Sequence, residues 1–223
     1  MSTWWWKIVV VVLLCYTVIA GFLGSVPALP ILHESIRNLY FHVAVMFATI
    51  ILLTVSLFFS VRHLSAFRQH DDLKAAEAVN VGVLFGILGV LTGSVWAKFT
   101  WGTWWVKDAK LNGTVVALLA YFAYMILRDS ITDRQKKARI SAVYNIFAWV
   151  MMLIFLLILP RMTASLHPGS GGNPGFGTYD LSNTMKLVFY PAVAGWTLLA
   201  LWLWEIRVRI RIINDKILNE KNL

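Results

Sequence analysis

Cysteine and charge are both scarce in this sequence. Cys15 is the single cysteine among 223 residues and lies inside an apolar run, which excludes a disulfide framework and a Cys-x-x-Cys thiol relay. Charged residues make up 14% of the chain, whereas soluble domains carry roughly a quarter. The sequence has no glycine-rich phosphate loop ending in Lys-Ser/Thr, and His33-Glu34 is not followed by a second histidine at zinc-protease spacing. It therefore indicates neither a thiol oxidoreductase, nor a nucleotide hydrolase, nor a zinc protease.

Apolar residues fill the chain instead. They make up 59% of it, and the mean hydropathy is +0.69. Runs of about 17 to 25 apolar residues are long enough to cross a bilayer as helices. Six such runs are present: Trp4–Val26, Leu39–Val61, Val79–Trp96, Leu111–Leu127, Val143–Leu159 and Thr184–Ile206. The connections between them are too short for a soluble core, so we expect an all-α, polytopic membrane protein with six transmembrane helices in one domain, residues 1–223.

The first apolar run has a second interpretation. Lys7 followed by an apolar stretch is also typical of a secretory signal peptide. Trp4, Trp5 and Trp6 precede the stretch, and tryptophans gather at membrane interfaces. The run is also long enough to span. We therefore expect a retained first transmembrane helix.

Lysine and arginine gather on one side of the predicted membrane. The formal net charge is +9, but the basic residues lie between apolar runs and form no single stripe, which argues against nucleic-acid binding. The side that holds both termini has fourteen: Lys7, Arg62, Arg68, Lys74, Arg128, Arg134, Lys136, Lys137, Arg139, Arg207, Arg209, Arg211, Lys216 and Lys221. The other side has six: Arg37, Lys98, Lys107, Lys110, Arg161 and Lys186. Because cytoplasmic loops carry the excess, both termini are predicted to be cytoplasmic, with three loops facing outward.

The second outward loop, about residues 96–112, is rich in tryptophan. Within it, Trp101, Trp104, Trp105 and Asp108, which we call the tryptophan segment, have the spacing i, i+3, i+4 and i+7. On a helix they would share one stripe. Tryptophans also serve as plain interfacial anchors. The density of indoles and the aspartate on the same stripe favour a binding platform over an anchor.

Two histidines are predicted on the same outward side. His42 lies near the outer end of the second apolar run, where an ionisable side chain is rare and usually functional. His167 lies in the last outward loop, just before the glycine-rich residues 169–177. Taken singly, His42 is equally well explained by a hydrogen bond to a helix carbonyl, and His167 by a solvated loop. Taken with the tryptophan segment, the two imidazoles suit the iron and the flat apolar ring of haem.

The two propionates of haem require cationic partners. Four outward basic residues qualify, and the sequence does not choose among them: Arg37, Lys98, Arg161 and Lys186.

The segment 101–111 resembles a motif of the tryptophan-rich haem-handling family of cytochrome c maturation. The family pattern reads Trp-Gly-Thr-Trp-Trp-Val-x-Asp-Ala-Arg-Leu, and this sequence departs from it at Lys110. Lys107 also stands where the family commonly has tryptophan, and no proline follows Val43. Six spans, the stretch 39–43 and the loop 165–167 are similar to the CcmC, or haem exporter protein C, branch of this family.

The resemblance implies a haem-handling protein that is not an enzyme. It implies that His42 and His167 are the axial ligands of a transiently bound b-type haem, and that the tryptophan segment binds the ring. It also implies a haem site on the periplasmic side of a bacterial inner membrane, transfer to the haem chaperone CcmE, and a complex with the ABC-type subunits CcmA and CcmB. His167 is the predicted releasing ligand, because it adjoins the glycine run.

Two other functions stay open at this point. A b-type membrane cytochrome that reacts with quinone also holds haem between two histidines, but it usually buries both ligands in the helix bundle. A haem permease subunit would line a path through the bilayer, and no charged residue interrupts the middle of the apolar runs.

Overall fold

The computed structural model describes residues 4–29, 32–163, 165–167 and 181–221, and these contain helices and no strands. The helices are α1 (Trp5–Leu23), the 3-10 helix η1 (His33–Tyr40), α2 (His42–Ala66), α3 (Gln69–Trp101), α4 (Ala109–Ser130), α5 (Arg134–Leu153), the π-helix η2 (Ile154–Ile158), α6 (Leu159–Met162) and α7 (Asn183–Lys221). Six helical stretches are long and apolar enough to cross a membrane. The predicted all-α class and the six spans are therefore confirmed.

Several helices run beyond the apolar stretches that predicted them. The run Val79–Trp96 is the middle of α3, which has 33 residues, and Thr184–Ile206 is the first part of α7, which has 39. A helix continues past its apolar part as long as its backbone stays hydrogen-bonded, so hydropathy marks the membrane-crossing part and not the helix ends.

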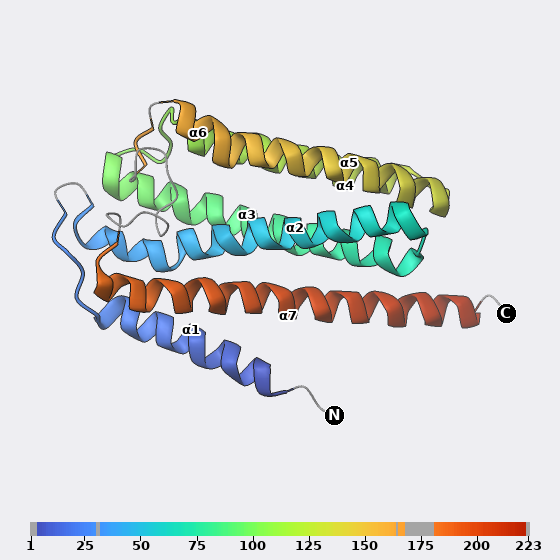
Figure 1. Ribbon diagram of the computed structural model, residues 1–223, viewed down its shortest axis with the longest axis horizontal. Coiled ribbons are helices and arrows are strands. Elements are labelled where there is room, and N and C mark those ends of the chain that lie inside the picture. The colour runs from blue at the N-terminus through green and yellow to red at the C-terminus, as the bar shows by residue number, and fades with distance from the viewer. Residues whose placement is uncertain (1–3, 30–31, 164, 168–180, 222–223) are drawn as a thin grey trace.

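The helices form two groups that lie side by side (Figure 1). In the first group, α2 packs against α3 and α7, and α1 packs against α7. In the second, α4 packs against α5 and η2. α1 begins and α7 ends toward the same end of the bundle, which we call the terminal end. The opposite end, where α2 begins at His42, is called the histidine end.

The two groups separate toward the histidine end. α2 and α3 pack against α5, and α3 against α4, but in the described part of the chain the backbones of η2 and α6 approach only the second group. Pro160 has no N–H to donate to a helical carbonyl, and the π-turn of η2 directly precedes it, with Leu159 N–H bonded to the oxygen of Ile154. The helix that contains η2 is thus irregular at the level where the two groups part.

Glycines on α3 let α2 and α4 approach closely. A Cβ atom on Gly82 would lie 2.8 Å from Leu53 Cδ2, and one on Gly86 would lie 2.6 Å from Leu118 Cδ2. Small residues allow close helix packing in membranes, where no hydrophobic effect drives the helices together.

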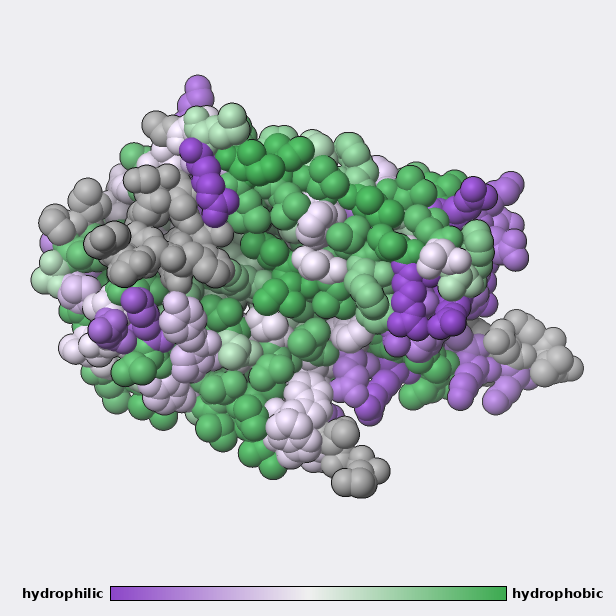
Figure 2. Space-filling model, viewed as in Figure 1, coloured by the Kyte–Doolittle hydropathy of each residue, from purple (hydrophilic) through white to green (hydrophobic). Residues whose placement is uncertain are grey.

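The surface matches a lipid environment. Figure 2 shows apolar residues over the middle of the molecule and hydrophilic residues mainly toward its ends. Large apolar side chains are exposed on every spanning helix, including Ile19 on α1 at 60% and Ile126 on α4 at 72%. Lipid is the solvent that accommodates such a surface, so this chain is a multi-pass membrane protein.

Candidate functional site

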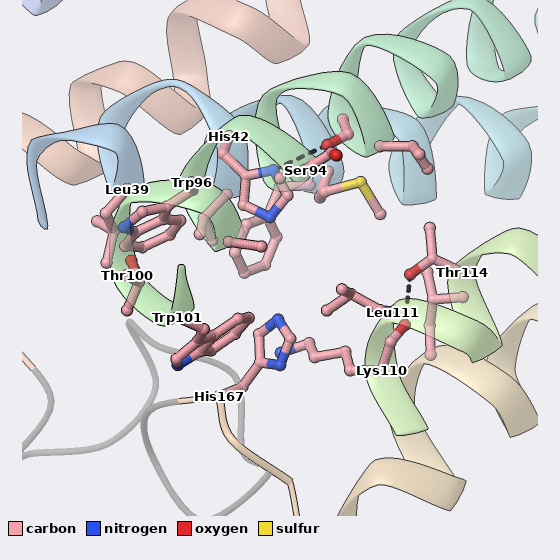
Figure 3. Close-up of a pocket in the computed structure, with 18 of the residues that line it drawn as sticks. Leu39, His42, Ser94, Trp96, Thr100, Trp101, Lys110, Leu111, Thr114 and His167 are labelled. Carbon is pink, nitrogen blue, oxygen red and sulfur yellow. Dashed lines mark hydrogen bonds between the residues drawn. The ribbon is translucent and has the colours of Figure 1, made fainter. Parts of the chain in front are cut away.

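A cavity at the histidine end separates the two helix groups. It has a volume of about 1170 Å³ including its open mouth. Its walls are mostly apolar and come from η1, α2, α3, α4 and η2, together with a few residues of the connections between them. Figure 3 shows His42 and His167 on opposite walls of this cavity, with both rings turned into it. The structure therefore brings together two histidines that are far apart in the sequence.

His42 is held in one orientation by α3. Its Nδ1 lies 2.9 Å from the carbonyl oxygen of Gly89 and 3.2 Å from Thr92 Oγ1. A carbonyl only accepts hydrogen bonds, so Nδ1 carries the proton and Nε2 has the free lone pair. A Cβ atom on Gly93 would lie 2.6 Å from His42 Cε1. Gly93 thus leaves the space that this ring occupies.

His167 is held in the same way by a carboxylate. Its Nδ1 lies 3.0 Å from Asp108 Oδ1, and its ring meets that of Trp101 edge to face at a centroid distance of 5.6 Å. Burial lowers the pKa of His167 to about 4, with a further lowering by Lys110 that Asp108 partly offsets. The imidazole is therefore neutral at pH 7 and donates its Nδ1 proton to Asp108. Its Nε2 is left as a potential metal ligand.

Asp108 is a buried hub between α4 and the loop of His167. Its side chain caps α4 by accepting from the backbone N–H groups of Lys110 and Leu111. The other carboxylate oxygen accepts from Ser165 Oγ and from the N–H of Leu166, each at 2.8 Å. Burial raises the pKa of Asp108, but these hydrogen bonds and His167 outweigh it and lower the pKa overall. The carboxylate is thus ionised and fixes the position of His167.

The prediction of a single helical stripe across the tryptophan segment was wrong. α3 ends at Trp101, Gly102 takes the left-handed conformation with φ 79°, and α4 begins only at Ala109. Glycine adopts this conformation without a Cβ penalty and commonly ends helices. Of the predicted loop of about residues 96–112, only residues 102–108 lie outside helices.

The three tryptophans consequently have different surroundings. Trp101 and Trp105 line the cavity. Trp104 is 59% exposed and is not among the lining residues. The indole N–H of Trp105 donates to Asn112 Oδ1 at 3.1 Å. The segment therefore provides two indoles to the cavity and one to the surface.

The four basic residues predicted as propionate partners do not line the cavity. Arg37 donates to the carbonyl oxygens of Gly21 and Gly24 at the end of α1. Lys98 donates to the Gly102 carbonyl, and Arg161 to that of Leu157. Lys186 lies near the start of α7 and is half-buried.

Lys110 is the residue that sequence reasoning missed. Position 110 does not belong to the i, i+3, i+4, i+7 stripe that was predicted as the platform, but Lys110 lines the cavity together with both histidines. Within the described part of the lining it is the only lysine or arginine. The family pattern has arginine at this position, and lysine has the same positive charge. This shared charge was a signal in the sequence that could have marked position 110 as part of the site.

Known proteins resemble this chain over much of its length. The family model described as "Heme exporter protein C", CcmC, matches residues 1–222. Proteins named Heme exporter protein C are 28% identical over 146 residues in Paracoccus denitrificans, 26% over 135 residues in Haemophilus influenzae and 32% over 105 residues in Escherichia coli K12. The aligned parts cover 65%, 60% and 44% of this chain.

The same alignments cover 60%, 54% and 40% of those relatives, so the chain spans about half of their length. The family model nevertheless extends over nearly the whole chain, and the described fold supplies the six spans that the resemblance implied. This chain belongs to the CcmC family of Heme exporter protein C.

Proposed function

We propose that the protein binds haem in the cavity at the histidine end, with His42 and His167 as the two axial ligands of the iron. The observation that supports this most strongly is the arrangement of the two imidazoles on opposite cavity walls, each with Nδ1 already hydrogen-bonded. Metal-binding histidines typically use the second nitrogen in this way to fix the orientation of the ring.

The rest of the cavity suits the haem ring. Apolar residues from α2, α3 and η2 match the porphyrin, and the indole of Trp101 lies beside one ligand. Lys110 is the cation that we propose for a propionate, since it lines the same space. Haem is the cargo here, and the chain's own residues orient it and exclude water from the iron.

We further propose that haem is delivered from this site to the periplasmic haem chaperone CcmE during cytochrome c maturation. In this scheme the histidine end faces the periplasm of a bacterial inner membrane, the b-type haem is bound transiently, and CcmA and CcmB are the neighbouring subunits. His167 is the ligand that lets go, because it lies on a loop whereas His42 begins a helix. Trp104 is exposed beside the cavity and offers a surface for the acceptor.

The test is haem retention in the purified membrane protein. We expect His42→Ala and His167→Ala each to lose most of the bound haem and the absorption spectrum of a bis-histidine complex. His70→Ala is the matched control, because His70 is exposed near the terminal end, in the first turn of α3. Full haem retention in both ligand variants contradicts the proposal.

A second measurement separates delivery from electron transfer. Haem-loaded protein is mixed with purified apo-chaperone, and with a quinol in a parallel sample. Loss of haem to the chaperone supports delivery. Stoichiometric retention of haem, together with its reduction by quinol, indicates a b-type cytochrome instead.

A further inference from the structure

A second cavity opens at the terminal end, away from the haem site. It lies between α3, α4, α5 and α7 and has a volume of about 1230 Å³ including its mouth. Its lining on α3 extends from Gln69 to Asn80, which is about 16 Å along a helix. Unlike the first cavity, it is lined mainly by charged and polar side chains.

Two carboxylates of this cavity, those of Asp72 and Glu77, are already paired. Arg128 donates from both terminal nitrogens to the two oxygens of Asp72, each at 2.7 Å. Arg207 donates to Glu77 at 2.7 Å, and Asn80 donates to the same carboxylate at 3.1 Å. The charges of Asp72 and Glu77 are thus balanced by those of Arg128 and Arg207, and these four residues offer little net charge to a ligand.

The rim of the cavity has an excess of positive charge. Arg134 and Lys137 of α5 and Arg211 of α7 line it, against the carboxylates of Asp129 and Asp215. Asp215 lies 3.7 Å from Arg134 and 3.9 Å from Arg211, which is longer than a hydrogen bond. The two arginine side chains are 68% and 63% exposed. The rim therefore holds one more positive than negative charge, loosely paired.

The rim also lies at the depth of lipid headgroups. The apolar run of α4 ends at Leu127 and that of α5 begins at Val143, so Arg134 and Lys137 lie just outside the apolar layer on one side. Basic pockets between transmembrane helices at this depth recognise phospholipid headgroups. Arginine and lysine form strong charge-assisted hydrogen bonds with phosphate oxygens.

We propose that this cavity binds a phosphate-bearing ligand through Arg134, Lys137 and Arg211, and that the ligand is the phosphodiester headgroup of a membrane phospholipid. The single negative charge of a phosphodiester matches the single excess positive charge of the rim. The bound headgroup bridges α5 of one helix group and α7 of the other, and so holds the two groups together at the terminal end. The haem cavity separates the same two groups at the opposite end.

The test counts lipids retained on the purified full-length protein. Wild type, the triple variant Arg134→Gln/Lys137→Gln/Arg211→Gln and a matched triple variant, Lys136→Gln/Arg139→Gln/Arg209→Gln, are extracted from phosphatidylglycerol and phosphatidylethanolamine vesicles and examined by native mass spectrometry. The matched variant removes three charges from the same two helices at exposed positions that do not line the cavity. A parallel sample titrates inorganic phosphate against lipid-free protein.

We expect one phospholipid on the wild type and on the matched variant, and binding weaker by at least about tenfold in the cavity variant. Phosphate binding without lipid retention, lost in the cavity variant alone, supports the site and assigns it to a soluble phosphate. Equal lipid and phosphate binding by all three proteins overturns the proposal. Haem content should equal that of the wild type in both triple variants, so the outcome is independent of the haem proposal.

Discussion

His167 and Asp108 form a hydrogen-bonded pair, with Nδ1 and Oδ1 3.0 Å apart. They are 59 positions apart in the chain, and Asp108 is 3% exposed. The same carboxylate begins α4 and anchors the backbone of the His167 loop. One side chain therefore sets both the start of a helix and the orientation of a proposed haem ligand.

The first prediction concerns this pair. Asp108→Asn should keep the cap of α4, since asparagine caps helices about as well as aspartate. It should weaken haem binding by about 10- to 100-fold, the usual cost of losing the partner of a metal-binding histidine. Haem titration followed by absorbance measures the affinity, and circular dichroism checks that the helix content is unchanged. A wild-type affinity in this variant contradicts the role of Asp108 as a positioning residue.

The second prediction concerns the space around His42. Gly93→Ala places a methyl group 2.6 Å from the present position of His42 Cε1, so the ring has to move. We expect the variant to fold and to lose the bis-histidine absorption spectrum. Val95→Ala serves as the control, because Val95 lies on α3 two positions away, is exposed and does not line the cavity. If the two variants have the same spectrum as the wild type, Gly93 does not position the ring.

The third prediction concerns the charge of Lys110. This lysine lowers the pKa of His167, because its positive charge disfavours the imidazolium. In Lys110→Met the pKa of His167 should rise from about 4 and stay below the ordinary value of about 6.5, because burial is unchanged. Nuclear magnetic resonance of histidine-labelled, haem-free protein measures it. The exposed Lys107→Met is the control, and a similar shift there contradicts a specific effect of Lys110.

The fourth prediction separates two tryptophans. Trp101→Ala removes the indole that packs against His167 and should reduce haem retention several-fold, in line with a loss of about 1 kcal/mol for such ring pairs. Trp104→Ala should retain haem, because Trp104 is exposed and outside the cavity lining. Haem content per mole of purified protein distinguishes the two. Equal losses would show that the whole segment acts as one platform.

The fifth prediction concerns stability. Asp72 and Arg128 are 12% and 17% exposed and form a bidentate pair between α3 and α4. Asp72→Asn leaves a largely buried guanidinium without its partner charge, which costs about 3 kcal/mol in comparable buried pairs. The double variant Asp72→Leu/Arg128→Met should recover much of that stability. Unfolding in mixed micelles by increasing denaturing detergent measures it, and equal stability of Asp72→Asn and wild type contradicts the prediction.

Much of the site was predictable from residue types and membrane topology. Successive spans cross the membrane in opposite directions, so the start of the second span and the loop between the fifth and sixth lie on the same side. The sequence therefore placed His42 and His167 at the same end of the bundle. The cavity between them could not be predicted in this way. It exists because η2 and α6 do not pack against α2 and α3. The glycine run 169–177, on which the prediction of His167 as the releasing ligand rested, lies outside the described residues.

The sequence by itself determined the six spans and the gathering of histidine and tryptophan at one end. These follow from hydropathy and composition, which act locally along the chain. Only the tertiary structure decided that the helix ends at Gly102 and that the buried Asp108 fixes the His167 loop. It also decided that Lys110 lines the cavity, whereas Arg37 binds the carbonyl groups at the end of α1. The physical reason is that the partners of a polar side chain come from other helices, and their positions are set by packing and not by spacing in the sequence.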